Sequence, residues 1–135
     1  MTTASETPTY VDASAFVKLV VADDESEALR AFLREGERRL VASAILGVEA
    51  VRVGRATAGE LARLMTRALE SVELVDVTAA IRARARLLDP VHLRTLDAIH
   101  LATALEVGAR DVLVYDRRLA DAAAGYGLNP VGPGA

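Results

Sequence analysis

The sequence contains no cysteine and no tryptophan, and it has only two phenylalanines and three tyrosines. Without cysteine the chain has no disulfide, no thiolate zinc site and no cysteine nucleophile, and the composition fits a reducing cytosol, where we expect the protein to act. Its hydrophobic content of 52% is therefore mainly aliphatic, and 135 residues are enough for the core of one ordinary domain.

Long hydrophobic runs are also missing. No apolar stretch approaches the length of about 18 residues that a transmembrane helix needs, so we expect no membrane contact. The first ten residues, MTTASETPTY, lack the basic and apolar regions of a signal peptide. We predict a flexible leader over residues 1–8, one domain over residues 9–131, and a flexible tail over residues 132–135.

Lysine is nearly absent, because fifteen of the sixteen basic residues are arginine. The net charge of −3 argues at first against a nucleic-acid partner. Neutralising the four candidate carboxylates described below would change that net charge to +1. Arginine suits bidentate phosphate contacts better than lysine does. The composition therefore permits a polyanion to bind at a local site bordered by arginine.

Short apolar runs alternate with helical patterns along the chain, which predicts an α/β fold with a mainly parallel sheet of four or five strands flanked by helices. The predicted strands cover residues 9–12, 38–42, 72–77, 111–115 and 128–131. The predicted helices cover residues 13–21, 25–35, 44–53, 58–69, 78–89, 96–107 and 117–124. Gly54 is predicted to end the third of these helices, and Ser43 and Thr95 to cap two of them.

Four carboxylates stand out: Asp12, Glu49, Asp97 and Asp116. Asp12 and Asp116 end two apolar runs, and the carboxyl ends of parallel strands form the usual ligand crevice of such folds. Carboxylates that converge there would repel one another without a cation between them. The pattern therefore favours a divalent metal site.

Each acid also has an ordinary structural explanation. Asp12 and Asp116 precede predicted helices and can serve as N-caps. Asp97 lies in a first helical turn, where the helix dipole stabilises a negative charge. Glu49 lies within an apolar helix, which is costly unless the carboxylate is paired or binds a metal.

Arg52 and Arg94 are the candidate ion-pair partners of Glu49. The sequence favours a hydrogen-bonded core role for His100, three residues after Asp97; a metal site built from His100 and Asp97 is the alternative. His92 lies in a loop and belongs to no recognisable site.

Four segments together resemble the PIN-domain family, in particular the VapC-type ribonuclease toxins of bacterial type II toxin–antitoxin systems. They are YVDASAFVKLV, the glutamate in SAILGVEAVR, TLDAIHLATAL and VLVYDRRLADAA. The resemblance extends from Tyr10 to about Val131. Each segment is weak alone, but TLDAIHLATAL followed by a strand that ends in Asp-Arg-Arg-Leu is a specific combination.

The resemblance implies that the four acids match the acidic quartet with which the family holds Mg²⁺ or Mn²⁺. Ser14 and Thr95 match polar positions that help to order the site. One position departs from the family pattern: Val114 stands two residues before the last acid, where the family often has Thr or Ser. This departure removes a hydroxyl that would help to orient Asp116.

The implied reaction is RNA cleavage by a metal-activated water, with no protein nucleophile. Asp12, Asp97 and Asp116 would hold one metal ion, and Glu49 would serve a second metal or orient the attacking water. Arg94 and Arg117 are candidates for phosphate contacts; for Arg118 we expect an exposed, solubilising role.

The resemblance also implies a cognate antitoxin that covers the acidic site, with an inserted arginine, and a homodimer. A second interpretation is a catalytically inactive PIN-like module that binds RNA or protein. A third is a phosphatase or DNA nuclease with the same metal chemistry. The sequence gives no indication of which RNA is cut.

Overall fold

A computed structural model describes residues 7–57 and 59–135 of the chain. Most of the predicted leader, residues 1–6, lies outside the described residues. Pro8, which we assigned to that leader, is instead the first residue of strand β1 (Pro8–Val11). Every residue of β1 is buried, because the strand lies at the centre of the sheet with helices on both faces.

Five parallel strands form the sheet, in the order β3-β2-β1-β4-β5. After β1, the strands are β2 (Arg39–Ser43), β3 (Glu73–Val75), β4 (Asp111–Leu113) and β5 (Asn129–Val131). The chain moves outward from β1 through β2 to β3, and then returns to the other side of β1 with β4 and β5. The fold class is therefore as predicted, with five strands in one parallel sheet.

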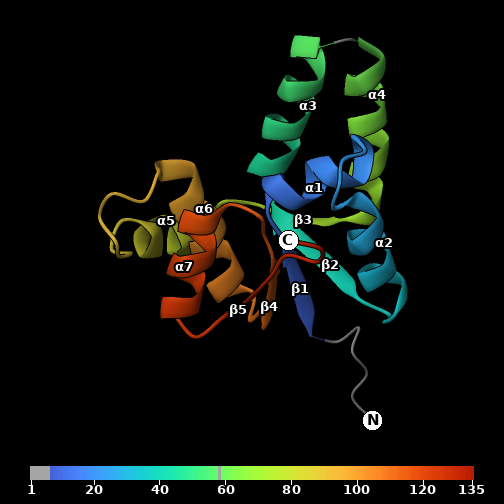
Figure 1. The fold of residues 1–135 in the computed structure, drawn as a ribbon. Helices are drawn as coiled ribbons and strands as arrows, with labels where there is room; N and C mark the ends of the chain where they lie inside the picture. The colour runs from blue at the N-terminus through green and yellow to red at the C-terminus, as the bar shows by residue number, and fades with distance from the viewer. Residues whose placement is uncertain (1–6, 58) are drawn as a thin grey trace.

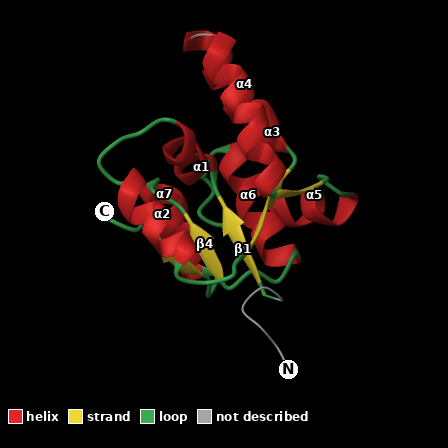
Figure 2. Cartoon of the chain, turned by 90° about the vertical axis from the view of Figure 1, so that its right-hand side faces the viewer, coloured by secondary structure: helices red, strands yellow, loops and turns green. Residues whose placement is uncertain are grey.

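Helices cover both faces of the sheet, which Figure 1 views roughly edge-on. One face carries helices α1 to α4 and the other carries α5 to α7, and the quarter turn in Figure 2 shows the sheet between them. Their bounds are α1 (Ala13–Val20), α2 (Ser26–Arg34), α3 (Ile45–Thr57), α4 (Gly59–Ala68), the short 3-10 helix η2 (Leu69–Ser71), α5 (Ala79–Ala85), α6 (Thr95–Glu106) and α7 (Arg117–Gly125). Among the helices of the described residues, none has the length and apolar character needed to cross a bilayer.

The core is aliphatic, as the composition predicted. Phe16 and Leu29 are completely buried between α1, α2 and the sheet, and Leu101 of α6 is buried on the other side. Tyr10 of β1 is also completely buried, and its hydroxyl has polar partners that belong to the site described below. The core therefore fixes β1 and α6 rigidly to each other.

Gly54 does not end α3, contrary to our prediction. The helix continues to Thr57, and Gly54 lies buried within it. A Cβ atom at Gly54 would lie 2.7 Å from the backbone Cα and N of Ala62 in α4. The glycine is thus needed for the close approach of two helices. Helices α3 and α4 form the hairpin that projects beyond the carboxyl edge of the sheet in Figure 1.

Two residues that we predicted to be helix N-caps lie outside the cap position. Ser43 is the last residue of β2, although its hydroxyl still accepts a hydrogen bond from the Ile45 N–H. Thr95 is the first residue of α6 and is exposed, and Arg94 precedes it without a side-chain cap. Leu96 of the same helix is 46% exposed and lines a pocket with Ile45 and Val48 of α3.

The C-terminal residues, which we predicted to be a flexible tail, fold back over the molecule. The Tyr115 hydroxyl donates a hydrogen bond of 2.8 Å to the carbonyl oxygen of Pro133. Gly134 has a φ of +84° and lies against Ala28 of α2. These contacts attach the end of the chain to the segment after β4, next to Asp116.

We expect Gly54→Ala to destabilise the fold by about 1–2 kcal/mol. Overpacking costs about 1–3 kcal/mol, and the higher helix propensity of alanine offsets up to about 1 kcal/mol of that cost. The contact is with backbone, so no side chain can rotate away from the added methyl group. Gly125→Ala is the matched control, since a Cβ there meets nothing within 4 Å. Urea unfolding of both variants measures the difference; equal stability would contradict the packing role of Gly54.

Candidate active site

The candidate site lies where the strand order reverses, between the carboxyl ends of β1 and β4. Asp12 directly follows β1, and Asp116 lies three residues after the end of β4. The Asp12 N–H donates to the carbonyl oxygen of Leu113, which ties the two strand ends together at 3.0 Å. Such a switch point is the common ligand crevice of open parallel sheets. The fold therefore brings together two acids that lie far apart in the sequence.

Asp12 is held in place by Ser14. The carboxylate oxygen Oδ2 of Asp12 accepts hydrogen bonds from the backbone N–H of Ser14 at 3.1 Å and from its hydroxyl at 2.7 Å. The same hydroxyl accepts a hydrogen bond from the backbone N–H of Tyr115 at 2.9 Å. Ser14 thus links the start of α1 to the segment after β4. Asp12 is only 4% exposed, so this anchoring fixes its side chain.

Asp116 caps α7. Its Oδ1 accepts a hydrogen bond from the backbone N–H of Leu119 at 3.0 Å. Val114, at the position where a hydroxyl was expected, is buried in the core and its N–H donates to the carbonyl oxygen of Val131. The cap therefore orients Asp116 without that hydroxyl. Both strand-end acids serve as N-caps, yet each cap uses one carboxylate oxygen and leaves the second for a ligand.

Asp97 comes to the site from the first turn of α6 and is partly buried. Burial raises the pKa of its carboxyl group, and the negative charges of Asp12 and Asp116 raise that pKa further. The charges of His100 and Arg94 act in the opposite direction. Asp97 therefore lies close enough to Asp12 and Asp116 for their negative charges to repel its own.

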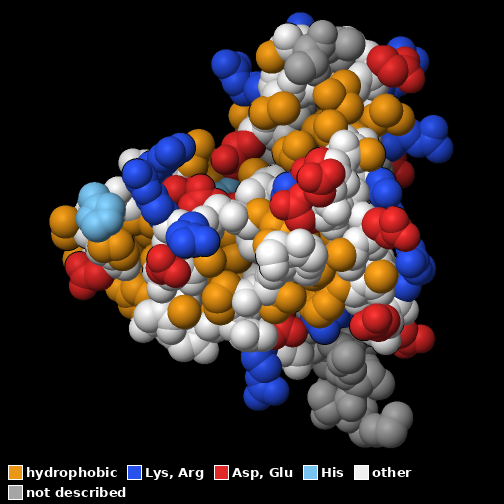
Figure 3. All heavy atoms as spheres, viewed as in Figure 1, with side chains coloured by type: hydrophobic (Ala, Val, Ile, Leu, Met, Phe, Trp, Pro, Cys, Tyr) orange, Lys and Arg blue, Asp and Glu red, His pale blue; other side chains and the backbone are white. Residues whose placement is uncertain are grey.

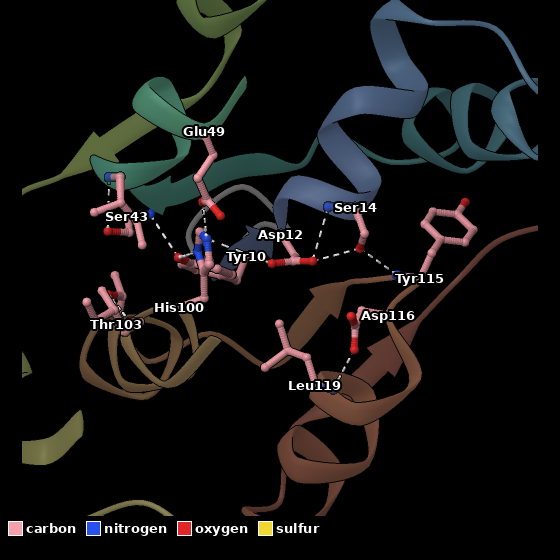
Figure 4. Close-up of polar contacts among 12 residues, drawn as sticks. Tyr10, Asp12, Ser14, Ser43, Glu49, His100, Thr103, Tyr115, Asp116 and Leu119 are labelled. Atoms are coloured by element: carbon pink, nitrogen blue, oxygen red, sulfur yellow. Dashed lines mark hydrogen bonds and ion pairs between the residues drawn. The ribbon is translucent and has the colours of Figure 1, made fainter. Parts of the chain in front are cut away.

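Glu49 reaches toward this group from α3, and its partner is a histidine rather than an arginine. Oε1 of Glu49 lies 2.6 Å from Nε2 of His100, one turn beyond Asp97 on α6. Figure 4 shows Glu49 pointing from the α3 ribbon to the His100 ring, with Asp12 to the right of that ring. The Asp12 Oδ1 is 3.9 Å from the same nitrogen. Neither Arg52 nor Arg94, our predicted partners, takes this place.

His100 is 1% exposed and belongs to a buried polar network. Its Nδ1 lies 2.7 Å from the hydroxyl of Tyr10, which accepts a hydrogen bond from the backbone N–H of Ser43 at 2.9 Å. Burial by itself would lower the pKa of His100, but the hydrogen bond to Glu49 and the charges of the surrounding acids outweigh it and raise the pKa above its usual value. Burial also raises the pKa of Tyr10, so Tyr10 stays neutral.

This network is the part of the site that the sequence did not predict. His100 was expected to be a hydrogen-bonded core residue, and this is confirmed, but its two partners were not identified. Tyr10 is ninety residues away in the chain, and Glu49 fifty-one. The available signal was that a glutamate on one apolar helix and a histidine on another each needed a polar partner.

The donor atoms fit a hard divalent cation, because the strand-end acids and Asp97 offer only carboxylate oxygens. Within residues 7–57 and 59–135, however, no three Asp, Glu or His side chains are spaced to enclose one ion directly. Mg²⁺ usually keeps several waters and binds one or two carboxylates. The arrangement therefore suits a partly hydrated ion better than a cage of three carboxylates.

The remaining predicted residues lie around this group. Arg94 precedes α6, Arg117 and Arg118 begin α7, and all three are exposed. Thr95 points into a pocket between α5 and α6, lined by Arg82 and Ile99, and no hydrogen bond joins its side chain to the acids in the described part of the chain. Figure 3 shows acidic side chains in the hollow between the α3–α4 hairpin and the α5–α7 lobe, with basic side chains along its border.

The family model for the PIN domain matches residues 9–125 of the chain. Ribonuclease VapC46 of Mycobacterium tuberculosis is 42% identical over 127 residues, which cover 92% of this chain and 96% of the relative. Ribonuclease VapC35 of the same species is 37% identical over 130 residues, covering 93% and 96%.

Solved structures share the fold at lower identity. VapC20 of M. tuberculosis, described as a Sarcin-Ricin loop cleaving toxin, has a TM-score of 0.74 at 18% identity and covers 93% of this chain and 99% of its own. VapBC2 from Rickettsia felis, bound to a promoter DNA fragment, has a TM-score of 0.71 at 12% identity, covering 91% and 96%. The arrangement of acids at the switch point, the family match and the VapC relatives agree: the chain belongs to the PIN-domain family and to its VapC group.

Proposed function

We propose that this chain is a Mg²⁺- or Mn²⁺-dependent endoribonuclease that acts as the toxin of a toxin–antitoxin pair. The observation that carries the proposal is the convergence of Asp12, Asp97 and Asp116. Burial, together with the charges of Asp12 and Asp116, raises the pKa of Asp97. The proposal is supported by relatives that are named ribonucleases. We place its action in the cytoplasm.

A bound divalent cation would stabilise charge on the attacked phosphate and make a bound water more acidic. Asp12, Asp97 and Asp116 would hold it, in part through its bound waters, with Asp12 kept in place by Ser14 and Asp116 by its helix cap. Glu49 would orient or deprotonate the attacking water through Oε2, because Oε1 is engaged with His100. The protein contributes no nucleophile of its own.

The substrate and the partner follow from the charges around the acids. Arg94 and Arg117 would contact the RNA phosphates beside the site, and Thr95 would help to order the start of α6. An antitoxin would cover the acids with an arginine or lysine, since a cation there replaces the field of the metal. Structures of toxin–antitoxin complexes with this fold support such a partner. We also propose a homodimer, for which the exposed Val48 and Leu96 beside Glu49 offer an apolar surface.

We expect Asp97→Asn to reduce RNA cleavage at least about 100-fold, because the loss of one preorganised electrostatic group at an active site has an effect of about this size. The metal-free variant should also melt at a higher temperature than the wild type at neutral pH. The raised pKa of Asp97 means that its ionised form is disfavoured in the fold, so neutral asparagine removes a cost. This difference should shrink as the pH falls through the pKa of Asp97 and the wild-type side chain becomes protonated.

Asp24→Asn, in an exposed turn, is the matched control. It should change neither the rate of RNA cleavage nor the melting temperature. Thermal melts with and without Mg²⁺, together with cleavage of a labelled RNA, measure all three proteins. Mg²⁺ should raise the melting temperature of the wild type more than that of Asp97→Asn. Wild-type turnover by Asp97→Asn in saturating Mg²⁺ would falsify the assignment of Asp97.

We expect the wild-type gene, expressed alone, to arrest growth and Asp12→Ala to relieve the arrest, because uncontrolled RNA cleavage is the harmful act. Asp121→Ala, an exposed acid on α7, is the matched control and should remain toxic. Colony counts and immunoblots of protein level give the measurement. A harmless wild-type protein at equal expression, or an equally toxic Asp12→Ala, would favour the inactive binding module instead.

We expect Arg117→Ala to weaken binding of single-stranded RNA and Arg118→Ala to leave it unchanged. Arg117 begins α7 directly after Asp116, whereas Arg118 lines a separate pocket with His92 and Asp121. Loss of one phosphate contact should also reduce the dependence of log Kd on log salt by about 0.7, the value for a single strand. Fluorescence anisotropy over a salt series separates the two; equal effects of both variants would contradict the assignment.

A further inference from the structure

The proposed cleavage reaction uses Glu49 but leaves its neighbour His100 without a role. His100 is 1% exposed, so it cannot contact RNA directly. Both ring nitrogens nevertheless have close partners, Tyr10 at 2.7 Å and Glu49 at 2.6 Å. A buried histidine with two such partners on different elements joins those elements together.

The direction of each hydrogen bond follows from the partners. An ionised Glu49 carboxylate only accepts, so Nε2 of His100 must carry the proton and donate it. The Tyr10 oxygen accepts the Ser43 N–H at 2.9 Å, and its own O–H donates to Nδ1 when the ring is neutral. The network therefore runs from the ends of β1 and β2, through His100 on α6, to Glu49 on α3.

The ring has no freedom to turn. Tyr10 is completely buried and packs edge-on against His100, with ring centroids 5.8 Å apart and an interplanar angle of 70°. The Glu49 side chain, by contrast, is 25% exposed on a hairpin that projects beyond the sheet. A glutamate has three side-chain torsions and would sample many rotamers at such a position without a fixed partner. Among the residues that the structure describes, the imidazole is the buried group that holds the Glu49 carboxylate.

We propose that His100 is a positioning residue that fixes one oxygen of Glu49 so that the other faces the acidic site. The inference rests on the proposed function, because it assumes that Glu49 takes part in cleavage. His100 acts through its hydrogen bond to Glu49, because Oδ1 of Asp12, at 3.9 Å from Nε2, is too far away for a hydrogen bond. It touches neither RNA nor the reacting atoms. Tyr10 in turn fixes the His100 ring. This role gives a reason for the buried tyrosine hydroxyl next to the acidic site.

Two amide substitutions separate the two ends of the ring. The amide nitrogen of His100→Gln reaches the position of Nε2 and can donate to Glu49. The amide of His100→Asn reaches only the position of Nδ1 and keeps the contact with Tyr10. We expect His100→Asn to lower kcat about 10–100-fold, as loss of an outer partner of a site residue does, with little change in KM. His100→Gln should retain most of the activity.

Leu101→Ala is the structural control, because Leu101 is buried on the same helix but has no polar role. It should lose stability and keep kcat. In a Glu49→Ala background, His100→Asn should cause no further loss of activity. The proposal is overturned if the two losses add, or if His100→Asn and His100→Gln have the same kcat while both are folded.

A measurement without RNA tests the contact by itself. The proton on Nε2 is buried and bonded to a carboxylate, so the wild-type protein should show a protected, downfield imidazole N–H resonance by NMR. Glu49→Ala should remove it and Leu101→Ala should keep it. If the wild type cleaves no RNA but shows this resonance, the proposed function fails and the contact stands. A resonance that is absent, or unaffected by Glu49→Ala, refutes the positioning role.

Discussion

Mutual repulsion among carboxylates is the constraint on which this site depends. Asp12 and Asp116 meet because β1 and β4 are neighbours at the point where the strand order reverses, and α6 brings Asp97 beside them. Together with burial, their charges raise the pKa of Asp97. A fold that holds such a group together loses stability there unless a cation or a basic partner binds. The same repulsion would favour both the divalent cation and the basic partner that we propose for this site.

Hydrogen bonds from the core keep the acids in place despite that repulsion. Ser14 connects Asp12 to the segment after β4, and the cap of α7 holds Asp116. His100 does the same for Glu49 from the opposite side of the site. Asp12, Asp116 and Glu49 therefore each keep one oxygen bound to the protein, and preorganisation of this kind lowers the cost of binding a ligand.

The position of Glu49 also depends on helix α4, which carries none of the four acids. Glu49 lies on α3, which packs against α4 so closely that Gly54 meets the backbone of Ala62. That hairpin forms one wall of the hollow seen in Figure 3, and the α5–α7 lobe forms the other. The two walls of the site are formed by packed helices, whereas the ends of β1 and β4 place two of its four acids, Asp12 and Asp116.

The sequence alone determined the fold class and the places of Asp12 and Asp116, because short apolar runs followed by an acid and a helical pattern are local signals. It also indicated that Glu49 needed a partner. Only the tertiary structure decided that this partner is His100, held by Tyr10, since the three residues come from separate elements and no local pattern records their distance. The continuation of α3 past Gly54 was decided in the same way: glycine ends a helix by local preference, but here the approach of α4 outweighs that preference.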